Sequence, residues 1–357
     1  MALSTAPGLT SRERARGCLL AGACGDALGA PVEFLGGAEI RARFGPGGVR
    51  DLVPAYGKLG AITDDTQMTL FTAEGLIRAH LRWLGRGVSD PIAVTKGAYL
   101  RWLLTQGYRP RQAEFPEDGW LLGLRDLHER RAPGNTCLSA LTGMPGGELV
   151  AANDSKGCGG VMRAAPAGLA AWPERAFELG DLCAAITHGH PTGRLAAGFL
   201  AAAVSVLSTG QALAAALDEA TALLRERADH EETLRAVEAA REEAARGRRE
   251  AVPERLGGGW IAEEALGIGV WAVLAADDLE GALVLAVSHG GDSDSTGSIV
   301  GNLAGTMLGE GAIPGRWLDR LELRAEIARV ADDLVECAEV GADEPAYDRL
   351  FERYPGH

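Results

Sequence analysis

The 288–310 segment, SHGGDSDSTGSIVGNLAGTMLGE, combines an acidic start with an apolar stretch in which glycine recurs every fourth residue. This spacing places Gly297, Gly301, Gly305 and Gly309 along one face of a helix. Each interior glycine costs a helix about 1 kcal/mol relative to alanine, so four on one face are unfavourable unless another backbone packs against them. The segment therefore predicts a buried helix in close contact with a second helix.

A segment near the N-terminus has a face of the same kind. A helix is expected to begin at Ser11, which is a candidate cap, and small residues then recur every fourth position at Gly17, Ala21, Gly25 and Gly29. We expect this helix to pack against the glycine face described above.

Acidic residues stand where the glycine-faced helix should begin. Asp292 and Asp294 are followed by Ser295 and Thr296. Aspartate and serine are good N-cap residues, but a cap requires only one of them. The surplus of oxygen donors, behind the Gly290–Gly291 pair, is what a Mg²⁺, Mn²⁺ or Ca²⁺ site requires. On this stretch alone, capping and cation binding are equally good interpretations.

A second helix start carries the same chemistry. Thr63, Asp64, Asp65 and Thr66 precede an apolar pattern with helical spacing, and Thr63 is a natural N-cap. Glu33 follows the end of the N-terminal helix. If the small-faced helices pack as expected, Glu33 and the two acidic pairs converge, and protons or divalent cations must offset the repulsion between their charges. An oxygen-only set with hydroxyl groups suits one or two Mg²⁺ or Mn²⁺ ions, which favours hydrolysis or phosphate-linked chemistry.

Two loops contain candidate substrate contacts. The longest segment without helical periodicity spans residues 110–160, and long irregular segments in compact domains are often functional. It holds Gly134 and a glycine-rich loop at 153–160, whose backbone N–H groups, together with Lys156, could hold a phosphate. His188 lies in the second loop with one other histidine two residues away. Without a cysteine or a third histidine nearby, a substrate hydrogen bond or a plain polar loop is favoured over zinc.

Composition narrows the class of protein. The chain has 357 residues, 46% of them hydrophobic, and no linker-like stretch, which predicts a single domain over residues 11–357 after a disordered segment at 1–10. Strand-like alternation is almost absent, so the predicted fold class is all-α. The formal net charge of −14 makes attraction to nucleic acid or an anionic membrane unfavourable. Six scattered cysteines fit a reduced, cytoplasmic compartment. The apolar run at 195–207 is too short to span a bilayer, and we expect a monomer.

Six blocks of the chain are similar, in the same order, to those of a known family. They read GCLLAGACGDALGAPVEF, TDDT, SKGCGGVMRAAP, THGHPTGR, GGGWIAEEAL and GGDSDSTGSIVGNLAG. From about residue 14 to about residue 320 the chain resembles the ADP-ribosylglycohydrolase family, the relatives of dinitrogenase-reductase-activating glycohydrolase. The resemblance implies a compact, orthogonal all-α bundle with a cleft for two divalent cations, Mg²⁺ or Mn²⁺, at helix N-termini. It also implies hydrolysis of the N- or O-glycosidic bond that joins ADP-ribose to a protein or small-molecule acceptor.

The resemblance also assigns roles by position. The implied metal ligands are Thr63, Asp64, Asp65, Asp292, Asp294 and Ser295. The implied catalytic residues are Glu33, Asp64 and Asp292. The implied substrate-binding residues are Gly134, Ser155, Lys156, Gly157, Cys158, Gly159 and His188. In this scheme the cations hold the distal ribose hydroxyls and orient a water toward C1″, where an oxocarbenium-like transition state develops.

Three positions depart from the family pattern. Ser295 stands where relatives have threonine, which keeps a hydroxyl ligand, and Cys158 stands where several relatives have asparagine. Arginine-directed members carry an acidic residue just before Gly-Asn-Thr, whereas this chain has Ala132-Pro133. A guanidinium leaving group would lose that partner, so serine-linked, nucleic-acid-linked and free ADP-ribosyl substrates stay open beside arginine-linked ones.

Two other interpretations remain at the sequence level. A Mg²⁺-dependent nucleotide phosphohydrolase would release AMP or phosphate in place of ADP-ribose. A non-catalytic, ADP-ribose-binding or structural member of the family would not need the TDDT and GDSDS blocks or Glu33, all of which are present.

Overall fold

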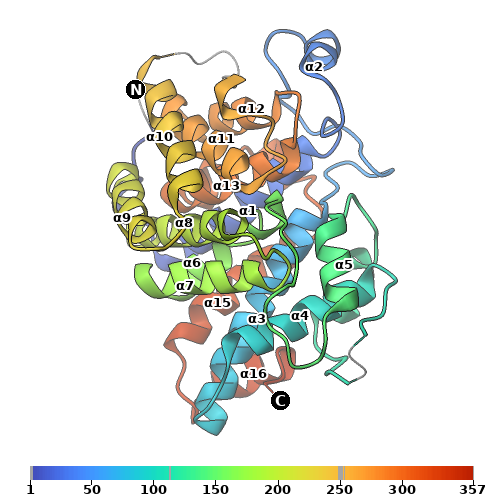
Figure 1. The fold of residues 1–357 in the computed structure, drawn as a ribbon. Helices are drawn as coiled ribbons and strands as arrows, with labels where there is room; N and C mark the ends of the chain where they lie inside the picture. The colour runs from blue at the N-terminus through green and yellow to red at the C-terminus, as the bar shows by residue number, and fades with distance from the viewer. Residues whose placement is uncertain (1–2, 112–113, 248–251, 253, 357) are drawn as a thin grey trace.

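The computed structural model describes residues 3–111, 114–247, 252 and 254–356. Within this part of the chain the backbone forms sixteen α-helices and short 3₁₀ turns. Pairing of extended backbone is limited, among the described residues, to two isolated bridges, Ala55 with Lys58 and Gly157 with Ile261. The prediction of an all-α fold is confirmed (Figure 1).

The helices follow one another with short connections over most of the chain. Their bounds are α1 (Ser11–Gly29), α2 (Gly37–Phe44), α3 (Asp64–Arg86), α4 (Pro91–Thr105), α5 (Asn135–Gly143), α6 (Ala165–Ala170), α7 (Pro173–Ala185), α8 (Pro191–Ser208), α9 (Leu213–Arg225), α10 (Glu231–Ala245), α11 (Ala262–Ala275), α12 (Leu279–Val287), α13 (Ser293–Leu308), α14 (Gly315–Leu318), α15 (Arg324–Glu339) and α16 (Pro345–Arg353).

Helix α13 is the central element, and it is the helix expected from the glycine spacing. It contacts α1, α3, α8, α11 and α12, and every residue from Ser293 to Met307 is buried. The helices that surround it come from both halves of the chain, as the colours of Figure 1 show. The N-terminal end of α13 therefore lies inside the protein, where its acidic residues need partners that offset their buried charge.

The close pairing of α1 with α13 confirms the prediction from small residues. A Cβ atom added to Gly301 would lie 2.1 Å from the carbonyl oxygen of Ala21, and one added to Gly305 would lie 2.0 Å from that of Gly17. Further along, a Cβ at Gly25 would meet a backbone oxygen of α13 at 2.1 Å. The two backbones touch directly, which explains why glycine is required despite its low helix propensity.

Two expectations for the N-terminal segment need correction. The cap of α1 is Thr10 rather than Ser11, because Thr10 and Glu13 form a reciprocal capping box. Residues 3–10, expected to be disordered, pack against the body: Leu3 is buried and the Ala6 N–H donates to the Met307 carbonyl at 3.0 Å. Residues 1 and 2 lie outside the described residues.

The apolar run at 195–207 belongs to a longer helix than we expected. Helix α8 has 18 residues and by length and composition could cross a membrane, so the argument from a short run was wrong. Its 18-residue window is 83% buried inside the protein, as in the core helix of a globular domain.

Candidate active site

The acidic residues of the two helix starts meet on the floor of one pocket. The pocket has a volume of about 620 Å³, and the N-terminal ends of α3 and α13 and the turn after α1 supply its floor. Five carboxylates and the Ser295 hydroxyl make up this floor: Glu33, Asp64, Asp65, Asp292, Asp294 and Ser295. The predicted convergence of these side chains is present in the structure. Thr63 lies beneath this floor, where it is fully buried.

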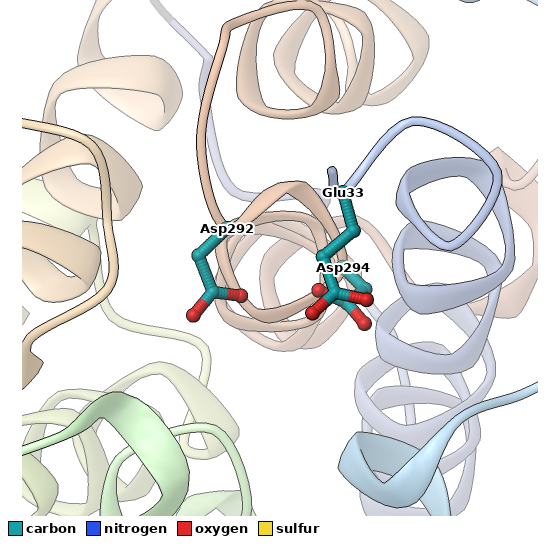
Figure 2. A group of neighbouring side chains, drawn as sticks. All are labelled: Glu33, Asp292 and Asp294. Carbon is teal, nitrogen blue, oxygen red and sulfur yellow. The ribbon is translucent and has the colours of Figure 1, made fainter. Parts of the chain in front are cut away.

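Three of these carboxylates form the tightest group. Glu33, Asp292 and Asp294 each offer an oxygen that lies within 4.8 Å of the others, and all three residues are buried. Figure 2 shows Asp292 and Asp294 projecting from the start of α13 toward the same side as Glu33, which comes from the turn after α1. This buried acidic triad could bind a metal ion.

The backbone of α1 brings Glu33 to this position. A Cβ atom at Gly29 would lie 2.3 Å from the backbone nitrogen of Asp294, so the end of α1 lies directly against the start of α13. The same glycine face that defines the fold therefore also sets the distance between the acids.

The start of α3 is held by a residue that the sequence reasoning left out of the site. Asp26, on α1, accepts hydrogen bonds from the Thr63 N–H at 3.0 Å and the Thr66 N–H at 3.1 Å, and a further short one from the Thr66 hydroxyl. Thr63 caps α3 by accepting from the Asp65 N–H, as predicted. A lone aspartate in the small and apolar 17–29 part of the helix was the available signal for Asp26.

The start of α13 separates the two interpretations of its acids. Asp292 occupies the N-cap position, but its side chain makes no capping hydrogen bond. Its carboxylate accepts instead from the Cys158 thiol, at 2.8 Å, across the pocket. Capping alone therefore does not account for Asp292, because its carboxylate contacts Cys158 in the pocket.

Orphaned oxygen atoms show how this floor fits a divalent cation. Glu33 Oε2 and Asp65 Oδ1 are buried and have no hydrogen-bond partner among the described residues. Buried polar atoms are normally satisfied, so unpaired carboxylate oxygens that face other carboxylates need a compensating cation or proton. The donors are all oxygen, which matches Mg²⁺ or Mn²⁺ better than zinc.

Burial and mutual repulsion raise the pKa values of the acids. The pKa of Glu33 rises to about 8, first through burial and then through repulsion from Asp292 and Asp64. The pKa of Asp64 also rises to about 8, mainly through burial. The pKa values of Asp65 and Asp294 lie well above the ordinary value for the same two reasons. Without a cation, this site holds protons in the neutral range.

These shifts predict how stability depends on pH. Unfolded carboxylates titrate near pH 4, so between about pH 4 and pH 8 the folded, metal-free chain binds more protons than the unfolded chain. The free energy of unfolding contributed by these acids is fully present below about pH 4 and is lost as the pH rises toward 8. We expect the melting temperature in EDTA to fall across this range, and Mn²⁺ to restore it most at the alkaline end, where cations replace protons.

The Glu33→Gln variant is the control for this prediction. It removes one of the raised carboxyl groups, so its melting temperature in EDTA should fall less steeply between pH 5 and pH 8. An identical slope in the variant and the wild type would contradict the assignment.

The predicted substrate residues divide into two groups. Gly134, Gly157, Cys158, Gly159 and His188 line the pocket together with the acids. Ser155 and Lys156 are not among the described residues that line it. The Lys156 ammonium pairs with Glu263 and, at 2.9 Å, with Glu232, while the Ser155 hydroxyl lies 3.0 Å from that of Thr136. In this arrangement acids of α10 and α11 hold the Lys156 charge, and its contact with a phosphate stays a prediction.

The glycines that line the pocket allow close approach of neighbouring groups. A Cβ atom at Gly159 would lie 2.9 Å from Cys137 Sγ and 3.1 Å from His188 Cε1, so this position requires glycine. The Gly134 N–H, which we expected near a phosphate, donates to Asp64 at 3.2 Å. Gly134 therefore positions an acid of the floor.

The rim of the pocket carries residues that the sequence did not indicate as site residues. Phe34 and Trp260 stack there with ring centroids 6.0 Å apart, and their exposed fractions are 72% and 46%. Arg130, on the opposite wall beside Ala132, is exposed. Exposed aromatic side chains at a pocket mouth are typical of ligand contacts, but no periodic pattern marks them in the sequence.

Fold and pocket together define a class: an all-α protein with a buried carboxylate centre at two helix N-termini and a glycine loop facing it. The family model described as ADP-ribosylglycohydrolase matches residues 7–343. The chain belongs to this family, as the resemblance predicted.

Relatives align over nearly the whole chain. The ADP-ribosyl-[dinitrogen reductase] glycohydrolase of Rhodospirillum rubrum is 29% identical over 93% of this chain and 98% of its own length. The ADP-ribosylarginine hydrolase Tri1 of Serratia proteamaculans is 26% identical over 92% of this chain and 80% of its own. A solved structure of an ADP-ribosylglycohydrolase-related protein complex covers 92% of this chain and 99% of its own, at 29% identity and a TM-score of 0.64.

Proposed function

We propose that this protein is a metal-dependent hydrolase that cleaves the glycosidic bond between ADP-ribose and a modified acceptor and releases ADP-ribose. The observation that carries the proposal is the convergence of five carboxylates on the floor of a pocket whose opposite wall is a glycine loop. The names of the related ADP-ribosyl hydrolases support the same reaction.

The proposed centre holds two divalent cations, Mg²⁺ or Mn²⁺. Its ligands would be Thr63, Asp64, Asp65, Asp292, Asp294 and Ser295, and the orphaned oxygens of Glu33 and Asp65 support a cation at this floor. Bound cations would supply Lewis acidity to the ribose hydroxyls and to the attacking water.

The chain's own groups account for the remaining requirements of glycoside hydrolysis. The floor carboxylates place negative charge where an oxocarbenium-like transition state becomes positive. Glu33 Oε2, buried and unpartnered, can accept a proton from the attacking water or return one to the leaving group. The glycine loop at 157–160 allows the diphosphate to approach the backbone closely.

The proposed acceptor is an ADP-ribosylated protein. The relatives are named for ADP-ribosyl-dinitrogen reductase and for ADP-ribosylarginine, which supports a protein acceptor. Ala132 and Pro133 lie on the pocket wall, so the wall has no carboxylate at these two positions to pair with a guanidinium. A cytoplasmic location is proposed with this function, and the six free cysteines support it.

The test is release of ADP-ribose from matched arginine-, serine- and DNA-linked substrates, each with Mg²⁺, Mn²⁺ or EDTA. We expect release from at least one linkage with metal and none with EDTA. Release of AMP or phosphate would replace the proposal with a phosphohydrolase. ADP-ribose binding without any release would replace it with a binding protein.

A further inference from the structure

A buried arginine lies directly behind the pocket histidine. Arg163 follows the glycine loop, and its guanidinium is buried between α3, α4 and α7. It donates to the Tyr99 hydroxyl at 3.1 Å, to the Cys183 carbonyl at 3.3 Å and to the Thr187 hydroxyl at 2.6 Å. It also lies over the Tyr99 ring, 4.3 Å from the centroid.

This cation has no carboxylate partner among the described residues of the chain. A buried charge without a counter-ion destabilises a core, so a neutral residue of similar size would be favoured at this position if packing were its only role. The shortest of these hydrogen bonds is the one to the Thr187 hydroxyl.

The Thr187 hydroxyl links Arg163 to His188 through two hydrogen bonds. A guanidinium can only donate, so the Thr187 oxygen accepts from Arg163 and must direct its single hydrogen elsewhere. The nitrogen and oxygen acceptors near it are His188 Nδ1 at 2.8 Å and the Ala184 carbonyl at 3.4 Å. The Ala184 carbonyl already accepts the N–H groups of Thr187 and His188, at 3.0 and 2.9 Å. The hydrogen therefore goes to His188 Nδ1.

The tautomer of His188 follows from this direction. In a neutral imidazole, a nitrogen that accepts a hydrogen bond leaves the proton on the other nitrogen. Burial, with a contribution from Arg163, lowers the pKa of His188 to about 3, so the ring is neutral at physiological pH.

The protonated nitrogen faces the glycine loop. Cβ atoms built on Gly157 and Gly159 would lie 3.5 and 3.4 Å from His188 Nε2, and His188 lines the pocket. Among the described residues, His188 Nε2 has no protein hydrogen-bond acceptor. A single N–H is therefore available there to an oxygen of a ligand.

We propose that Arg163 acts through Thr187 to hold His188 as the neutral Nε2–H tautomer, so that the pocket presents a fixed hydrogen-bond donor to an ADP-ribosyl oxygen. Arg163 and Thr187 are thus positioning residues, and the role of the donor rests on the proposed function. A neutral donor suits a pocket with five carboxylates, because it does not pair with them as an imidazolium would.

The test compares Thr187→Val, which has the same shape without the hydroxyl, with Thr187→Ser, which keeps it. In protein labelled with ¹⁵N-histidine, long-range proton–nitrogen spectra distinguish the two neutral tautomers, and His188→Gln assigns the signal. We expect the Nε2–H pattern in the wild type and in Thr187→Ser, and a mixed or Nδ1–H pattern in Thr187→Val. A wild type in the Nδ1–H form, or an unchanged pattern in Thr187→Val, would overturn the proposal.

Binding of free ADP-ribose, measured by calorimetry, gives the second measurement. Loss of one well-oriented neutral hydrogen bond should weaken binding roughly fivefold in Thr187→Val and little in Thr187→Ser. In a His188→Ala background, Thr187→Val should have no further effect, and an equal loss there would show that Thr187 does not act through His188. If neither the wild type nor any variant binds ADP-ribose, the proposed function fails, while the spectra still decide the tautomer of His188.

Discussion

Replacement of Asp292 by asparagine is expected to remove activity while it stabilises the metal-free protein. Asparagine keeps the shape of the side chain and can still accept the Cys158 thiol hydrogen, but it lacks the charge. We expect cation affinity to fall by roughly 100-fold and turnover by on the order of 10²–10³-fold. In EDTA at pH 8 the variant should melt at a higher temperature, because one of five mutually repelling carboxylates has been neutralised.

These opposite changes in activity and stability are expected of a residue whose charge serves a functional site. A residue whose charge stabilises the fold would lose stability when the charge is removed. Cation affinity is measured by calorimetry with Mn²⁺, turnover by ADP-ribose release, and stability by thermal unfolding monitored at 222 nm. Asp218→Asn is the matched control, since Asp218 is an exposed partner of Arg241 and should leave all three quantities unchanged. An Asp292→Asn protein with full turnover would disprove the assignment of this residue to the centre.

The second large effect concerns the helix pair that positions the centre. Gly301→Ala should destabilise the fold by at least about 3 kcal/mol, although alanine favours a helix by about 1 kcal/mol over glycine. The added Cβ would lie 2.1 Å from the Ala21 carbonyl oxygen and 2.3 Å from its carbon. Both atoms belong to the main chain of α1, which cannot rotate away as a side chain could, so the two helices must separate.

Gly267→Ala provides the comparison within another buried helix. A Cβ at Gly267, on α11, would lie 3.4 Å from the Ala236 carbonyl oxygen, an ordinary contact distance. The free energy of unfolding of this variant should be unchanged or should rise by up to about 1 kcal/mol. Denaturant unfolding followed by circular dichroism measures both. Equal midpoints for Gly301→Ala and the wild type would show that α1 and α13 are not packed backbone to backbone.

Much of the architecture could be predicted because the constraint is local and periodic. The glycine spacing of α13 and the small residues of α1 identify two helix faces that lack bulky side chains. In the structure these two faces pack against each other. The end of α1 and the acids at the start of α13 are therefore brought together by this packing, whereas the start of α3 is held beside them by its hydrogen bonds to Asp26. The all-α class follows from the same periodicity.

The roles of several polar residues could not be read from local patterns. Lys156 stands in a loop whose composition suits phosphate, but its ammonium is held by Glu232 and Glu263, which are 76 and 107 residues away in the chain. Asp26 lay in a helix with no visible need for a carboxylate until the start of α3 was placed beside it.

The sequence by itself determined which helices pack at backbone contact and which acids stand at their ends, because helical period and glycine's missing side chain are properties of the chain alone. Only the tertiary structure decided where each buried charge finds its partner. The Asp292 carboxylate faces Cys158 and not its own helix, and the Arg163 guanidinium faces Thr187 and not an acid. Such pairings join residues far apart in the chain, and their energies depend on burial and distance, which no local pattern encodes.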